Sequence, residues 1–290
     1  MITIGLSSYS MSRAINDGRM DIFQVMDFIK ANGGKHIEMV PCGKLSMYKD
    51  GKIDEEFIDK IVQYSQKIEL PVSSYTIGAN FALDSDEDVR KEIERIKVEI
   101  DVAAKLGVKR MRHDAGWSNV ATYSVYEKYL PKVVYAFQEL ADYAKPFGIT
   151  TSLENHGYLF QGSERVQRVI NAVARDNFRT TMDVGNFLCA DECPVIAAQN
   201  NLPFASFIHF KDFYIRKNPA CKDGYFRSMH GMWLKGAVTG EGDVDLVTIT
   251  KLIKESDYDG FLSIEFEGSE DCVEACVRSL RNVNALFENN

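Results

Sequence analysis

The chain has 290 residues, of which 45% are hydrophobic and 26% are charged, and its formal net charge is −8. These values are ordinary for a folded globular protein and exclude disordered and fibrous classes. The acidic balance argues against nucleic acid as a partner, since binding to a phosphate backbone normally needs a basic surface. Barrels of about this size commonly form one domain, so we expect residues 1–290 to be a single domain.

Strand-like and helix-like segments alternate eight times along the chain. The predicted strands cover residues 2–6, 36–40, 72–75, 108–112, 148–157, 179–186, 206–212 and 261–267. The predicted helices cover residues 21–31, 54–68, 86–106, 124–146, 163–174 and 194–199, then a segment from Asp243 or Asp245 to Glu255, and finally 270–287. This alternation predicts a parallel (β/α)8 TIM barrel with its helices outside.

One region breaks the alternation. Residues 213–242 are rich in glycine, aromatic and basic residues and show neither a helical nor a strand period. We expect an irregular lid or binding loop here, because long irregular segments inside compact domains are often functional. His230 and Trp233 are candidates for closing over a ligand, and anchoring of the loop is the simpler role for both.

The sequence gives no sign of export or of membrane insertion. No basic leader precedes an apolar run, and no stretch approaches the roughly 18 apolar residues that cross a bilayer. Six cysteines in a chain of this length indicate free thiols, so we expect a cytoplasmic protein and no membrane partner. The pairs Cys189/Cys193 and Cys272/Cys276 have a spacing that suits one helix face, but core packing explains them better than a soft-metal site.

Four predicted strands end in residues that bind metals. Side chains alternate between the two faces of a strand, so residues two apart share a face. By this rule Glu154, Asp183, His209 and Glu265 lie on the polar, inner face of their strands. Each one alone fits a helix cap, an ion pair or a buried histidine about as well. Together they predict a metal site at the mouth of the barrel, because buried charges need a partner or a metal.

Three carboxylates and one imidazole form a mostly hard donor set. Such a set favours Mn²⁺, Mg²⁺ or Co²⁺ over a thiolate-bound metal. A bound divalent ion polarises a carbonyl group and makes the adjacent carbon acidic, and carboxylates beside the ion can then move the proton.

Further polar residues near strand ends are candidates for contact with a substrate: His156, Lys211, His113, Glu38 and Arg112. We expect Lys211 to polarise a substrate oxygen, with an ion pair as the alternative. Arg112 and His113 end the fourth strand and could hold a hydroxyl group or a phosphate, whereas a structural ion pair is the simpler role for Arg112. His156 and Glu38 could each contact a sugar, with packing as the alternative.

Five motifs, taken in order, resemble the sugar phosphate isomerase/epimerase family of xylose isomerase-like barrels. They are residues 153–157 (LENHG), 182–186 (MDVGN), 208–212 (IHFKD), 240–245 (GEGDVD) and 264–267 (IEFE). The resemblance covers essentially the whole chain. It implies one divalent ion, usually Mn²⁺ with Mg²⁺, Co²⁺ and Zn²⁺ as alternatives, held by Glu154, Asp183, His209 and Glu265.

In ketose 3-epimerases of this kind, two glutamates face opposite sides of the substrate, and Glu154 and Glu265 match their positions. The resemblance implies that one removes a proton beside the carbonyl, giving a metal-stabilised enediolate, and that the other returns it. The sequence departs from the epimerase pattern in two places. Asn186 stands where those enzymes commonly have a histidine, and Lys211 follows the metal-binding histidine where they have an arginine.

Three functions therefore stay open. The leading hypothesis is a metal-dependent isomerase or epimerase that acts on a monosaccharide or a derivative. The second is a metal-dependent lyase or dehydratase that acts on a keto sugar or an inosose, since the same intermediate can expel a neighbouring substituent. The third is a non-catalytic sugar-binding barrel. A small carbohydrate is the expected partner in each case, and a homo-oligomer is compatible with the sequence.

Overall fold

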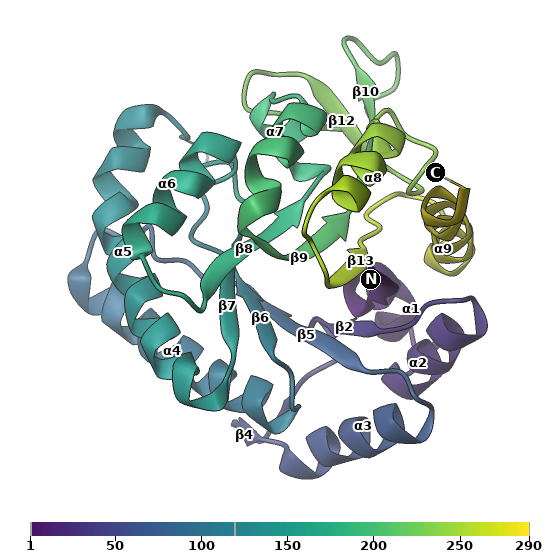
Figure 1. The fold of residues 1–290 in the computed structure, drawn as a ribbon, viewed down its shortest axis with the longest axis horizontal. Helices are drawn as coiled ribbons and strands as arrows, with labels where there is room; N and C mark the ends of the chain where they lie inside the picture. Colours follow the sequence, from purple (N-terminus) through teal and green to yellow (C-terminus); the bar gives the residue numbers. More distant parts are fainter. Residues whose placement is uncertain (1, 119, 290) are drawn as a thin grey trace.

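A closed parallel barrel forms the centre of the computed structural model, which describes residues 2–118 and 120–289 (Figure 1). Its strands are β1 (Thr3–Ser7), β2 (Ile37–Met39), β5 (Val72–Ile77), β6 (Arg110–His113), β7 (Thr150–Glu154), β8 (Phe178–Asp183), β9 (Ala205–Phe210) and β13 (Phe261–Ile264). Around the ring they follow the order β1-β13-β9-β8-β7-β6-β5-β2, and β2 closes it by pairing with β1. Every neighbouring pair is parallel. The predicted (β/α)8 barrel is confirmed.

Helices surround the strands (Figure 1). They are α2 (Ile22–Ala31), α3 (Glu55–Lys67), α4 (Asp86–Lys105), α5 (Tyr123–Ala144), α6 (Ser163–Val173), α7 (Pro194–Asn201), α8 (Leu246–Glu255) and α9 (Cys272–Asn289). Each of these overlaps a predicted helix. The starts have local causes, because the side chains of Asp54, Ser85 and Asp245 accept the first free N–H groups of α3, α4 and α8. Asp245, rather than Asp243, is therefore the N-cap of α8.

Short elements lie between these units. They are η1 (Ser8–Met11), α1 (Ser12–Asn16), η2 (Lys145–Phe147), η3 (Asn186–Ala190), η4 (Leu202–Phe204) and the hairpin of β3 (Tyr48–Lys49) and β4 (Lys52–Ile53). Segments this short carry too few residues to show a period in the sequence. No helix in the described part of the chain has both the length and the apolar character needed to cross a membrane.

The expectation of an irregular loop over residues 213–242 is partly wrong. β10 (Asp212–Arg216), β12 (Trp233–Ala237) and β11 (Phe226–Arg227) form a small antiparallel sheet in that order, which projects beside the barrel (Figure 1). β12 is not recognisable in the sequence, because it contains Gly236 and glycine is unfavourable within a strand. The structure requires it, because a Cβ there would lie 2.6 Å from the backbone of Glu267.

The interior of the barrel is charged near the C-terminal ends of the strands and aromatic closer to their N-terminal ends. The charged side chains belong to Glu154, Asp183, His209 and Glu265. Below them His36, Phe207 and Phe261 form an aromatic layer, with ring centres 4.9 Å apart for His36 and Phe261 and 6.1 Å apart for His36 and Phe207. Phe207 also contacts the ring of His209 at 5.6 Å, so the layer lies directly beneath the charged groups.

Candidate metal centre

Four potential metal ligands converge at the C-terminal mouth of the barrel. One ligand atom from each of Glu154, Asp183, His209 and Glu265 lies within 4.8 Å of the others. They stand at the ends of β7 and β8, within β9, and directly after β13. All four residues are buried, with exposed fractions of 0 to 8%. These are the four residues that strand alternation predicts to share the inner face of the barrel.

The two ring nitrogens of His209 have different surroundings. Nδ1 faces the other three residues of the cluster, at 2.9 Å from Glu154 Oε1, 3.9 Å from Glu265 Oε2 and 4.0 Å from Asp183 Oδ2. Nε2 points the other way and lies 2.9 Å from Glu38 Oε1. Burial alone would lower the pKa of this imidazole, but the surrounding carboxylates, Glu38 first among them, raise it.

Backbone hydrogen bonds hold only one of the two carboxylate oxygens of Asp183. Its Oδ1 accepts the backbone N–H groups of Gly185 at 2.8 Å and Asn186 at 2.9 Å. The side chain of Asn155 clamps the backbone of Asp183, accepting its N–H and donating to its carbonyl, both at 2.8 Å. Oδ2 is buried, and no described residue donates a hydrogen bond to it, although Lys211 Nζ lies 3.3 Å away. Asn155 of the motif at residues 153–157 therefore fixes the position of Asp183 in the motif at residues 182–186. Burial raises the pKa of the Asp183 carboxyl.

Lys211 is a buried cation within the cluster. Its Nζ lies 2.6 Å from Glu265 Oε2, 3.3 Å from Asp183 Oδ2 and 3.4 Å from Glu267 Oε2. Burial would raise the pKa of the Glu265 carboxyl, but the ammonium of Lys211 and the imidazole of His209 lower it. Lys211 thus points inward as predicted, and it already has an ion-pair partner on each side.

The charge balance of the mouth fits a divalent cation. Among the described residues, four buried carboxylates (Glu38, Glu154, Asp183 and Glu265) face two buried cations (Arg112 and Lys211) and the imidazole of His209. Negative charge exceeds positive charge even when the imidazole is protonated, and in a region that water does not screen this is costly unless a cation binds. Asp183 Oδ2, which lacks a hydrogen bond from the described residues, offers a further acceptor for such an ion. Oxygen donors with one imidazole match the preferences of Mn²⁺ and similar ions.

A chain of charged groups leads from Glu154 to the surface. Arg112 Nη2 donates to Glu154 Oε2 and, at 2.8 Å, to Asp114 Oδ1. Asp114 Oδ1 also lies 3.0 Å from His156 Nδ1, and the side chain of His156 is 44% exposed. Asp114, Glu154 and His156 form a second trio of potential metal ligands. The guanidinium between them already supplies the positive charge, so Arg112 has the ion-pair role that was its simpler interpretation.

Two expected substrate contacts are corrected by the structure. His113 lies outside the mouth, because it follows the inward-pointing Arg112 and so faces the helices, where its ring stacks on Phe137 at 5.0 Å. Burial lowers the pKa of His113 to about 4. Glu38 points into the barrel but is fully buried. Its carboxylate binds His209 and Thr76, and it does not reach a surface that a sugar can contact.

The motif at residues 240–245 has a structural role. The carboxylate of Asp212 accepts four backbone N–H groups, from Phe213, Gly240, Gly242 and Val244, at 2.8 to 3.1 Å. A Cβ at Gly242 would lie 2.1 Å from Asp212 Oδ1, so only glycine fits there. Asp212 therefore fastens the return of the 213–242 segment to the barrel.

The tip of that segment crosses towards the far side of the mouth. Met229 N donates to the carbonyl of Cys189 at 2.9 Å, and Tyr158 Oη donates to the carbonyl of Arg227 at 2.8 Å. His230 pairs with Asp191 at 2.9 Å, and the guanidinium of Arg227 lies 3.8 Å from the ring centre of Trp233. These contacts agree with the simpler interpretation of His230 and Trp233 as anchors.

Three further residues at the mouth, Asn155, Asp114 and Tyr9, carry no clear signal in the sequence. Asn155 orients Asp183, and Asp114 orients Arg112 and His156. The contacts of Asn155 with Asp183 and of Asp114 with His156 join residues that are distant in the sequence. Tyr9, two residues beyond β1, is the third. The Glu267 carboxylate and burial raise the pKa of its hydroxyl group, and the Glu265 carboxylate adds to this effect. The position of Tyr9 just after a strand end is the one signal that could have found it.

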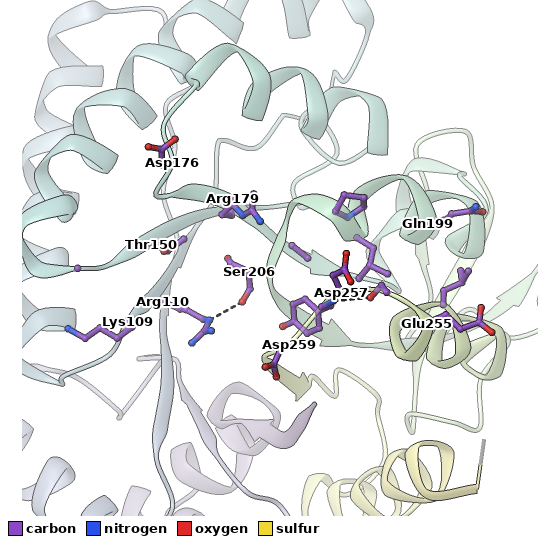
Figure 2. A pocket seen from close by; sticks show the side chains of 17 residues that line it. Lys109, Arg110, Thr150, Asp176, Arg179, Gln199, Ser206, Glu255, Asp257 and Asp259 are labelled. Carbon is purple, nitrogen blue, oxygen red and sulfur yellow. Dashed lines mark hydrogen bonds between the residues drawn. The ribbon is translucent and has the colours of Figure 1, made fainter. Parts of the chain in front are cut away.

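A hollow of about 1020 Å³ lies at the opposite, N-terminal end of the barrel (Figure 2). Lys109, Arg110 and Arg179 line it together with Asp257, but none of the four potential metal ligands does. Figure 2 shows Arg110 directed at Ser206, whose carbonyl accepts its Nε–H at 2.9 Å. The same guanidinium lies 5.1 Å from the ring centre of Phe261, so the aromatic layer separates this hollow from the cluster.

The fold and the buried cluster together define a TIM-barrel protein of the enzyme type, with polar groups gathered at the C-terminal mouth. The chain belongs to the xylose isomerase-like TIM barrel family, whose model matches residues 26–283.

Individual relatives show what the chain is similar to. It is 26% identical over 137 residues to an inosose dehydratase of Lacticaseibacillus casei, a match that covers 45% of this chain and 44% of that protein. The chain therefore matches less than half of the length of this curated relative.

Two solved structures have the same fold at low identity. The IOLI protein with a binding zinc atom has a TM-score of 0.74 at 17% identity, with 98% of both chains covered. A D-allulose 3-epimerase from Methylomonas sp. has a TM-score of 0.70 at 16% identity, with 98% of both chains covered.

Proposed function

We propose that the chain is a divalent-metal-dependent enzyme that moves a proton beside the carbonyl group of a keto sugar or a related polyhydroxy ketone, with isomerisation or epimerisation as the outcome. The observation that carries this proposal is the convergence of Glu154, Asp183, His209 and Glu265 in one buried cluster. A barrel that only bound sugars would not need so many buried carboxylates, whose burial is costly.

The same four residues would hold the ion, and we propose Mn²⁺ as the one used. The zinc atom in the similar IOLI structure is consistent with a metal at this type of site. When bound, a divalent ion would polarise the substrate carbonyl and make the neighbouring C–H group more acidic.

Glu154 and Glu265 are the proposed acid and base. β8 and β9 separate their strands in the ring, so the two carboxylates approach the mouth from different directions. Each is paired with its own cation, Glu154 with Arg112 and Glu265 with Lys211. Lys211 lowers the pKa of Glu265, so this group is ionised before the proton transfer, and it would become more basic when Lys211 turns to a substrate oxygen. Glu154 would start the cycle with a proton taken from water and give it to the other side of the substrate, and Glu265 would release its proton to water afterwards.

His156 and Lys211 are the proposed substrate contacts. The half-exposed His156 has its Nδ1 committed to Asp114, which leaves Nε2 for a substrate hydroxyl group. Lys211 can donate to a substrate oxygen by exchanging one of its carboxylate partners. Arg112 would hold Glu154 in place rather than reach the sugar itself.

Dehydration is the second candidate function, and two observations favour it. The curated relative is named an inosose dehydratase. Elimination also needs a donor for the departing hydroxyl group, and Lys211 and His156 both lie at the mouth to supply one. In this case the base removes the same proton, and the neighbouring C–O bond breaks in place of reprotonation at carbon.

One experiment tests both candidates. Ketoses, 3-keto sugars and inososes are incubated in heavy water with the protein and Mn²⁺, and the products are followed by NMR and mass spectrometry. We expect deuterium beside the carbonyl, with a mass that changes only by the added deuterium for epimerisation and falls by one water for dehydration. Full turnover after complete removal of metal would rule out the proposed chemistry.

We also propose that the enzyme is cytoplasmic. Its six cysteines are all free thiols, which agrees with a reducing compartment.

A further inference from the structure

We infer that Glu38 is a positioning residue for the metal site: it binds Nε2 of His209 and so directs Nδ1 towards the ion. This inference rests on the proposed function, because it assigns a role within the same metal site. Glu38 does not touch the reacting atoms. It acts only through His209.

The geometry separates the two nitrogens of the ring. The three other potential ligands lie 2.9 to 4.0 Å from Nδ1, while Glu38 Oε1 lies 2.9 Å from Nε2. A metal ion at Nδ1 would need that nitrogen without its proton, so the remaining proton of the imidazole would be on Nε2. Glu38 Oε1 stands where it accepts a hydrogen bond from Nε2, and the ring then presents Nδ1 to Glu154, Asp183 and Glu265.

A second contact fixes Glu38 itself. Thr76 Oγ1 on β5 donates to Glu38 Oε1 at 2.5 Å, so one carboxylate oxygen joins Thr76 and His209. The residues come from β2, β5 and β9, and β9 lies across the barrel from the other two in the ring order. All three are buried, with exposed fractions of 0 to 2%. No described residue donates a hydrogen bond to the other oxygen, Oε2.

Residues that orient a metal-binding histidine in this way typically change metal affinity about 10- to 100-fold when they are replaced. A glutamine at position 38 can donate to Nε2 through its amide. That contact stabilises the tautomer with the proton on Nδ1, in which the ring cannot bind the ion. Thr76→Val removes the hydroxyl that fixes Glu38 and leaves the carboxylate in place, so its effect should be smaller.

The experiment measures the affinity of the metal-free protein for Mn²⁺ by calorimetry, in the wild type and in Glu38→Gln, Thr76→Val and Glu99→Gln. Glu99 is the matched control, because it is a buried carboxylate that accepts a hydrogen bond from Tyr75 Oη at 2.7 Å on the outer face of the barrel. We expect binding about 10- to 100-fold weaker for Glu38→Gln and unchanged for Glu99→Gln. In the Zn²⁺-loaded wild type, ¹⁵N NMR should show the proton of His209 on Nε2.

The outcomes separate the two levels of inference. A folded Glu38→Gln variant that binds Mn²⁺ as tightly as the wild type would overturn the role of Glu38 and leave the metal site standing. If Glu38→Gln does not fold, an unchanged affinity in Thr76→Val together with a proton on Nδ1 overturns it. A wild type that binds no divalent ion would overturn the proposed function and this inference with it.

Discussion

The two ends of the barrel use similar charged residues in different surroundings. At the N-terminal hollow, Lys109, Arg179, Asp257 and Asp259 are all exposed to water. At the C-terminal mouth, the charged groups are almost completely buried, with exposed fractions of 0 to 9% for Glu38, Arg112, Glu154, Asp183, His209, Lys211 and Glu265. Water screens charges at the first end, whereas each charge at the second end needs a protein partner or an ion.

The comparison shows which end can do chemistry. Exposed charges of both signs stabilise little and can be exchanged with little effect. Buried carboxylates in excess over cations create a strong local field, and such preorganised fields are a main source of catalysis. Four predictions test this contrast, and they run from the largest expected effect to the smallest.

Replacing a carboxylate at the mouth should abolish most of the activity. Glu154→Gln is expected to lower kcat about 10²- to 10⁴-fold, the usual contribution of a proton-transfer group. The rate of deuterium incorporation into the substrate measures it, and Asp257→Asn at the N-terminal hollow is the control. Equal losses in the two variants would contradict the assignment of chemistry to the mouth.

Removing the buried cation should destabilise the metal-free protein. Lys211→Met leaves Asp183 and Glu265 without their ammonium partner, so we expect a loss of about 3–5 kcal/mol in the free energy of unfolding. Urea unfolding measures it. Added Mn²⁺ should restore part of the loss, because an ion that binds only the folded state stabilises it. A variant as stable as the wild type would show that Lys211 does not balance the cluster.

Acid should destabilise the fold through buried neutral histidines. Burial lowers the pKa of His113 from 6.5 to about 4, so between these pH values the unfolded chain binds the proton more tightly and stability falls as the pH falls. The loss approaches about 3 kcal/mol for this group. His113→Phe should keep the contact with Phe137 and remove this part of the pH dependence. Urea unfolding from pH 7 to 4 checks it, and identical pH profiles would refute the neutral state.

Changes at the N-terminal hollow should have the smallest effects. Arg179→Gln removes an exposed charge, and we expect activity within about twofold and stability within about 0.5 kcal/mol of the wild type. The measurements are the same kinetic and urea experiments. A loss as large as that of Lys211→Met would show that the two ends are not as different as their burial indicates.

The sequence predicts the fold well because its signals are periodic. The stripe Val89, Ile93, Ile96 and Ile100 is buried against the barrel in α4, as its spacing predicts. β10 and β12 escaped prediction because Gly236 and the charged residues around it interrupt the strand period. Pairing with a distant strand, which stabilises such segments, leaves no local signal.

The site is predictable where alternation decides it and unpredictable where distant partners do. Strand parity placed Glu154, Asp183, His209 and Glu265 on the inner face. The same rule, applied to two adjacent residues, shows that Arg112 and His113 cannot both point inward, which explains the error at His113. The role of Glu38 depends on a contact with His209, 171 residues away, which no local pattern contains.

The carboxylate of Asp212 grips both ends of the 213–242 segment, since it starts β10 and also accepts the N–H groups of Gly240 and Gly242. The two ends of the segment are thus fixed at one point of the barrel, whatever the length of the chain between them. A shorter or longer turn between β10 and β12 is therefore compatible with the same barrel and the same cluster of potential metal ligands.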